Sequence, residues 1–128
     1  MKITLNLVAV NCLNRANEIF LKNGRFHIAA THEKEIAEIY EQTLNEPEKA
    51  IKYYLSAADR FSIDDSVAIA QGCSLKAATI SAEIEKYEEA AKLFESIAED
   101  SANDQLRKYS VKDYLFRAGL CRLCLDVN

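Results

Sequence analysis

Alanine and aromatic residues recur along this chain at helical spacing. Three times an alanine precedes an aromatic ring by four residues: Ala16 and Phe20, Ala50 and Tyr54, Ala90 and Phe94. These pairs lie 34 and 40 residues apart, and a second set of alanines (Ala37, Ala77, Ala118) repeats at 40 and 41 residues. Two interleaved small-residue markers with such a period are typical of a helix–turn–helix solenoid.

The apolar periodicity predicts six helices. They cover about residues 8–22, 25–44, 47–61, 66–84, 87–100 and 107–125. Asn23-Gly24 is expected to end the first helix, Pro47 to lie in the first turn of the third, and Asp64-Asp65-Ser66 to cap the fourth. Taken in order, the helices form three antiparallel hairpins. We therefore expect an all-α, TPR-like α-solenoid that forms a single domain over residues 1–128.

The composition narrows the class of protein further. The chain has 128 residues, 49% of them hydrophobic and 28% charged, with three glycines and one proline, which leaves little room for β-hairpin turns. A net charge of −4 argues against a generally basic nucleic-acid binder, so we expect no nucleic-acid partner. No run of 18 apolar residues indicates a membrane span, and we expect a cytoplasmic protein. The four cysteines are interpreted as free, buried thiols.

A search for chemical sites in the sequence is mostly negative. His32-Glu33-Lys34-Glu35-Ile36 lacks the second histidine of a zinc-protease helix, and His27 and His32 do not share a helix face. Cys121 and Cys124 do share one, and core packing is the favoured interpretation over half of a metal or redox site. We expect no catalytic residue, no metal site and no cofactor, and hence no enzyme.

Several segments resemble the α-type soluble NSF attachment proteins (SNAPs). The resemblance lies in residues 11–16, 24–30, 36–41, 48–54, 75–78 and 106–121. The Lys-Tyr-Ser-x-Lys-Asp-Tyr run at residues 108–114 is its most specific part. Only the first ten residues do not match the family pattern.

The resemblance implies both a fold and a function. Members of this family are TPR-like solenoids that bind the assembled SNARE four-helix bundle and recruit the NSF-type AAA ATPase, which pulls the bundle apart. They associate with membranes only peripherally, and they have no active site. The alternative is a generic TPR-like scaffold that binds a peptide in its groove.

The resemblance also assigns a SNARE-facing surface. Its matching positions here are the basic residues Arg25, Lys76, Lys112 and Arg117, together with Leu106 and Tyr109. Lys76 and Arg117 precede Ala77 and Ala118, so the two charges occupy one repeat position and are expected to line up. Thr31 and Gly72 stand where the family typically has lysines, so the SNARE-facing surface carries fewer basic residues here.

The family's N-terminal repeats, membrane-attachment loop and C-terminal bundle have no counterpart here. We therefore expect a core fragment of a longer solenoid, one that holds a SNARE bundle without stimulating its disassembly. Exposed apolar helix faces at both ends are expected to promote self-association.

Overall fold

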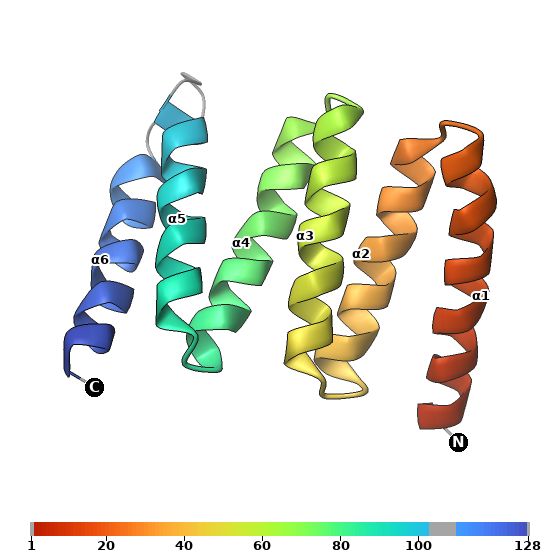
Figure 1. Ribbon diagram of the computed structural model, residues 1–128, viewed down its shortest axis with the longest axis horizontal. Helices are drawn as coiled ribbons and strands as arrows, with labels where there is room; N and C mark the ends of the chain where they lie inside the picture. Colours follow the sequence, from red (N-terminus) through yellow and green to blue (C-terminus); the bar gives the residue numbers. More distant parts are fainter. Residues whose placement is uncertain (1, 103–109, 128) are drawn as a thin grey trace. The chain divides into compact units, whose positions relative to one another are not determined.

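The computed structural model describes residues 2–102 and 110–127. In these residues the chain forms six α-helices and no strand, which confirms the all-α prediction (Figure 1). The helices are α1 (Lys2–Lys22), α2 (Phe26–Gln42), α3 (Pro47–Ile63), α4 (Val67–Glu83), α5 (Tyr87–Ala102) and α6 (Val111–Val127). The predicted start of the last helix at residue 107 lies outside the described residues.

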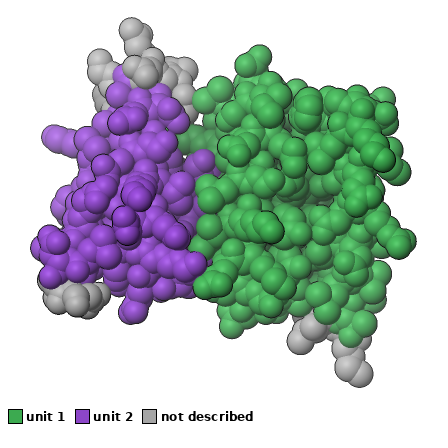
Figure 2. All heavy atoms as spheres, in the orientation of Figure 1, with its two compact units in different colours: residues 1–73 green, residues 74–128 purple. Residues whose placement is uncertain are grey.

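The chain divides into two compact units, Met1–Cys73 and Ser74–Asn128 (Figure 2). In the first unit α1 packs on α2 and α2 packs on α3, and the three helices run side by side (Figure 1). In the second unit α5 packs on α6, and the part of α4 that belongs to this unit joins their core. The single domain over residues 1–128 stays a prediction.

A glycine turn ends α1, as the sequence predicts. Gly24 has φ +74°, a left-handed conformation that other residues rarely adopt. Its N–H donates to the carbonyl of Leu21 at 3.2 Å, and the N–H of Arg25 donates to that of Phe20 at 2.9 Å. These two bonds form a Schellman motif, which satisfies carbonyls at the end of the helix and directs the chain into α2.

The same turn follows α3 and α4 without a glycine. Asp65 (φ 60°) and Glu85 (φ 66°) take the left-handed position. After each of them, the next N–H donates to a carbonyl five residues earlier at 2.8 Å. The recurrence of one turn geometry gives each following helix a similar start, although Asp and Glu adopt this conformation at some cost.

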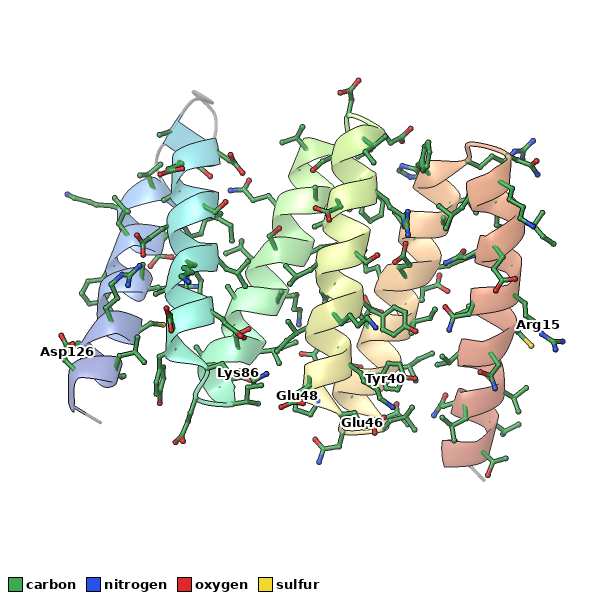
Figure 3. All side chains as sticks on the ribbon, in the orientation of Figure 1. Arg15, Tyr40, Glu46, Glu48, Lys86 and Asp126 are labelled. Atoms are coloured by element: carbon green, nitrogen blue, oxygen red, sulfur yellow. The ribbon has the colours of Figure 1, made fainter. Side chains whose placement is uncertain are left out.

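The turn between α2 and α3 is built differently. Asn45 has φ 52°, and the N–H of Glu46 donates to the carbonyl of Tyr40 at 2.8 Å. The ring of Tyr40 stacks on Tyr53 with centroids 5.6 Å apart, and Figure 3 shows Tyr40 and Glu46 beside this turn. Pro47 then begins α3, where a missing N–H is harmless, as predicted.

Alanines and aromatic rings fill the interior at the repeat positions. Ala50 and Tyr54 are fully buried in the first unit, while Ala90 and Phe94 are buried in the second. Tyr54 donates its hydroxyl to Glu41 Oε1 at 2.8 Å, and burial together with this bond raises the pKa of the phenol. The second set of alanines is buried as well: Ala37, Ala77 and Ala118. Ala16 and Phe20, the first pair of the repeat, are only half-buried. The repeat in the sequence therefore marks the core from α2 onward and only partly in α1.

Helix α1 departs from the sequence prediction in two ways. It begins at Lys2 and not near residue 8, because nothing between residues 2 and 8 breaks a helix. The interpretation of all four cysteines as buried is also wrong for Cys12, which is exposed, and the apolar residue Ile19 on the same helix is 63% exposed. The side that faces α2 carries Val10 and Asn17 instead, because only one side of α1 is covered.

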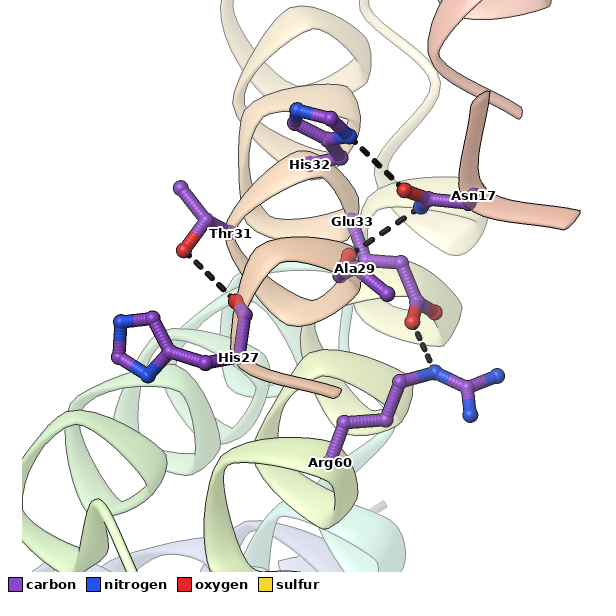
Figure 4. A network of polar contacts seen from close by, with 7 residues as sticks. All are labelled: Asn17, His27, Ala29, Thr31, His32, Glu33 and Arg60. Carbon is purple, nitrogen blue, oxygen red and sulfur yellow. Dashed lines mark hydrogen bonds and ion pairs between the residues drawn. The ribbon is translucent and has the colours of Figure 1, made fainter. Parts of the chain in front are cut away.

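A buried polar network connects the helices of the first unit (Figure 4). Asn17 on α1 donates through Nδ2 to the carbonyl of Ala29 at 3.1 Å, and its Oδ1 accepts from His32 Nδ1 at 2.8 Å. Glu33 on α2, whose side chain is only 8% exposed, forms an ion pair with Arg60 on α3. Polar contacts thus fix the position of α2 against both of its neighbours.

The glycine turn generates a prediction with a matched control. Gly24→Ala should lower the free energy of unfolding by about 1 kcal/mol, because an L side chain is strained at this φ. Gly72→Ala, in the middle of α4, should raise it by about 0.5–1 kcal/mol, since a helical glycine gains from a methyl group. A Cβ at Gly72 meets no described atom within 4 Å. Chemical denaturation measures both changes. If the two substitutions changed the free energy of unfolding in the same direction, the assigned role of Gly24 would be contradicted.

The buried ion pair generates a second prediction. Arg60→Met leaves the Glu33 carboxylate buried without its ion-pair partner and should cost about 2 kcal/mol, less than for a fully buried pair because Arg60 is 29% exposed. The control is Arg122→Met, which breaks an exposed pair with Glu95 and should cost less than about 1 kcal/mol. Equal losses of unfolding free energy in urea titrations would show that the buried Glu33–Arg60 pair contributes no more to stability than the exposed Arg122–Glu95 pair.

Candidate partner-binding surface

The structure places all four predicted cations at the surface. In the first unit, Arg25 is the residue that follows the glycine turn. In the second unit, Lys76 lies on α4, and Lys112 and Arg117 lie on α6. All four are exposed. The other two predicted contact residues, Leu106 and Tyr109, lie outside the described residues.

Arg25 owes its position to the turn before it. It occupies the N-cap position of α2 with φ −89° and ψ 69°, and its carbonyl accepts the N–H of Ala29 at 3.2 Å. Because its backbone joins the Schellman turn to the first turn of α2, the base of the side chain is held in place. The flexible guanidinium then projects from a rigid corner of the first unit.

Lys76 and Arg117 share a local environment. Each directly precedes a buried alanine, Ala77 at 0% and Ala118 at 3% exposure. A residue adjacent to a buried position on a helix points about 100° away from it. Both cations are exposed, although Ile36, directly before the corresponding Ala37, is fully buried. That they line up along one side of the unit stays a prediction.

Arg117 already has partners within its own unit. Its Nη2 lies 3.2 Å from Asp113 Oδ2 one turn earlier, and its Cζ lies 5.9 Å from the centroid of the Phe94 ring. The side chain is 47% exposed, so the ion pair is screened by water and weak. An acidic partner that reaches Arg117 must compete with Asp113, and its net gain is correspondingly small.

An apolar groove beside Arg117 is a feature that the sequence did not reveal. It has a volume of about 540 Å³, and its lining includes Ala82 on α4, Phe94 on α5, and Leu120 and Cys124 on α6. Read alone, Phe94 fits the helical core stripe of α5, whereas Leu120 is 45% exposed. The groove forms because small side chains on α4 lie near the larger ones of α5 and α6. The small residue Ala82 is the only sequence signal of the groove.

The Cys121-x-x-Cys124 pair borders the same groove. Cys121 is buried in the core of the second unit and Cys124 is half-buried. Burial, and after it the neighbouring Cys124, raises the pKa of the Cys121 thiol, so this thiol stays protonated and unreactive near neutral pH. The packing of Cys121 agrees with the favoured interpretation. In the described part of the chain, no three His, Cys, Asp or Glu side chains form a group suited to a metal ion.

Among the described helices, none combines the length and the apolar character that crossing a bilayer requires.

Comparison with known proteins identifies the family. Residues 2–128 match the family model described as "Soluble NSF attachment protein, SNAP". The alpha-soluble NSF attachment protein of Mus musculus is 44% identical over 119 residues, which are 93% of this chain and 40% of that protein. The beta-soluble NSF attachment protein of Bos taurus is 45% identical over 118 residues, 92% of this chain and 40% of the relative. The vesicular-fusion protein SEC17 of Komagataella phaffii is 41% identical over 120 residues, with the same coverage.

These matches confirm the resemblance and the fold class. The chain spans about 40% of the length of the curated relatives it matches. The family consists of helical solenoids built from TPR-like repeats, in agreement with the six helices described above. The chain belongs to the soluble NSF attachment protein family.

Proposed function

We propose that this protein is a vesicle-trafficking adaptor that binds the assembled SNARE four-helix bundle; in the full-length family such an adaptor links the bundle to an NSF-type AAA ATPase for disassembly. The observation that carries the proposal is the exposure of Arg25, Lys76, Lys112 and Arg117 at the positions that the family resemblance assigns. The names of the relatives, which are NSF attachment and vesicular-fusion proteins, support it.

The interaction is mainly electrostatic. The chain as a whole carries a charge of −4, so an acidic coiled coil is attracted only where cations are concentrated locally. Each exposed ion pair contributes about 1 kcal/mol or less, and such pairs chiefly set the rate and orientation of encounter. Useful affinity then requires several adaptors around one bundle, because linked weak contacts gain from avidity.

This role needs neither catalysis nor insertion into a membrane. We propose a cytoplasmic adaptor without enzymatic activity or cofactor, associated with membranes only peripherally through the SNAREs it binds. The naming of its relatives as attachment proteins supports an adaptor over an enzyme.

A second candidate function is peptide binding in the manner of a generic TPR-like scaffold. The groove of about 540 Å³ next to Phe94 favours it, because an apolar trough between helices suits the side chains of a bound peptide. An extended peptide would contact Leu120 and Cys124 there. Such binding would depend little on salt, and this distinguishes it from the SNARE interaction.

We also propose that the protein self-associates. Large apolar side chains are exposed on α1 and on α6, including Leu5 at 68%, Phe116 at 65% and Leu123 at 58%. Exposed apolar side chains of this size on a helix favour contact with a partner protein.

The adaptor proposal predicts salt-sensitive binding to a purified, assembled SNARE bundle. Binding should weaken steadily as ionic strength rises from about 0.05 to 0.3 M, because screening shortens the reach of exposed charges. Changing Arg25, Lys76, Lys112 and Arg117 together to Glu should weaken binding at least about tenfold, which corresponds to about 1.4 kcal/mol spread over four contacts. Isothermal titration or surface plasmon resonance measures both effects.

The control reverses four other exposed lysines with the same total change in charge: Lys22, Lys49, Lys52 and Lys92. Lys92 matches Arg117 closely, since it too is paired with an acidic residue four positions away. Equal losses in the two variants would show that net charge acts without a defined surface. Binding that ignores both salt and charge reversal would remove the four cations from the interface. Absence of binding at low salt would contradict the adaptor proposal for this chain.

A further inference from the structure

The apolar groove of the second unit carries one charge of each sign in its lining. Its volume is about 540 Å³, and residues of α4, α5 and α6 surround it. Arg117 belongs to the α6 wall and Glu83 to the α4 wall, while Phe94 on α5 is part of the apolar lining. All of these residues belong to one compact unit. The groove is thus formed by three helices together and not by one uncovered helix face.

The two charges lie toward opposite ends of the groove. Along α6 the lining runs from Arg117 to Cys124, which are seven residues or about 10 Å apart. The side chain of Tyr87 hydrogen-bonds to that of Cys124. Glu83 is the last residue of α4 and precedes Tyr87 by only four residues across the tight α4–α5 turn. Glu83 is therefore near the Cys124 end, away from Arg117.

Both charges can reach a ligand, although not to the same degree. Glu83 is exposed, and its side chain has no ion pair within the described part of the chain. Arg117 is 47% exposed, and its ion-pair partner Asp113 lies one turn away on the same helix. A cation of the ligand therefore meets an uncompensated carboxylate, whereas a carboxylate of the ligand shares Arg117 with Asp113.

We propose that the groove binds an extended peptide in which one large apolar residue lies between an acidic and a basic residue. The acidic residue lies at Arg117 and the basic residue at Glu83. This inference rests on the second candidate function, peptide binding, and specifies its ligand. Apolar grooves with a few convergent polar groups are the usual form of a binding site, and the polar groups set the orientation of the ligand. Here charge complementarity selects the pattern.

The length of the groove fits five residues of such a peptide. Alternate residues of an extended chain point to the same side, so the first, third and fifth side chains face the groove together. The first and fifth residues lie about 13 Å apart, and the flexible side chains of Arg117 and Glu83 can span this distance. The third residue then lies near Leu120, which is midway between Arg117 and Cys124 on α6. Opposite it, the small side chain of Ala82 leaves room for a large apolar group.

The apolar contact and the charges have different roles in this proposal. Leu120 is 45% exposed, and covering it removes apolar surface from water, which supplies most of the affinity. Each exposed charge pair contributes little, so the charges mainly determine which peptide binds and in which direction. Because five residues bury little area, we expect a dissociation constant of roughly 0.1–1 mM.

Charge-swap variants test the pattern in NMR titrations. The probe is the peptide acetyl-Glu-Ala-Phe-Ala-Lys-amide, and its controls carry Glu at both ends, Lys at both ends or Gln at both ends. The wild-type chain should bind the probe at least about threefold more tightly than each control. Arg117→Glu should shift the preference to the peptide with two Lys, and Glu83→Lys to the peptide with two Glu. The double variant should prefer the probe again.

Arg122→Glu is the matched control for Arg117→Glu. It makes the same substitution on the same helix, at an exposed residue that pairs with Glu95 and is not part of the groove lining. It should leave the order of the four peptides unchanged. Circular dichroism checks that each variant folds. If Arg122→Glu shifted the preference as Arg117→Glu does, the net charge of the unit would explain the result, and the proposal would be wrong.

Filling the groove tests where the peptide binds. Ala82→Leu places a larger side chain in the groove and should weaken binding of the probe at least about tenfold, because the apolar residue of the peptide loses its space. Ala68→Leu makes the same change at an exposed position of the same helix and should alter binding less than about twofold. Unchanged binding to the Ala82→Leu variant would locate the peptide elsewhere and overturn the proposal.

The outcomes separate this inference from the broader proposals. Equal binding of all four peptides, lost in Ala82→Leu, would keep peptide binding in the groove and overturn the charge pattern. Absence of binding for every peptide would overturn this inference together with the second candidate function. Binding to the SNARE bundle is measured separately, and neither result decides it.

Discussion

Close approach of helices at buried alanines is the constraint on which the rest of this protein depends. Ala50 and Ala90 lie at 0% exposure, and the ring four residues later is buried beside each of them. A small side chain lets two backbones approach, and the aromatic ring fills the space on either side of the contact. The tight turns fit this spacing, because a loop of a few residues can join two closely packed antiparallel helices.

The same constraint determines where charge can be presented. Lys76 and Arg117 are exposed directly before the buried Ala77 and Ala118, whereas Ile36 is fully buried directly before Ala37. A charge can therefore be presented directly before a core alanine, although that position is not exposed in every repeat. A solenoid can therefore vary its exposed residues without disturbing its packing.

Much of this organisation could be predicted from the sequence, and the exceptions have physical causes. Helix content, the Gly24 turn and the Pro47 start depend on local chemistry, and they were predicted. The turns at Asp65 and Glu85 were not predicted. Asp and Glu do not indicate a left-handed conformation in the sequence, and packing imposes it on them. The outward direction of Ile19 and the groove beside Phe94 depend on which faces neighbouring helices cover, and periodicity alone does not tell a covered face from an open one.

The intramolecular contacts of Arg117 limit how much this residue can contribute to binding a partner. Its ion pair with Asp113 and its contact with the Phe94 ring orient the guanidinium before any partner arrives. Preorganisation lowers the entropy lost on binding, yet an incoming carboxylate gains little when it displaces one that is already present. A single cation of this kind therefore contributes more to orientation than to affinity. Under the proposed adaptor function, a stable complex therefore requires several such modest contacts to act together.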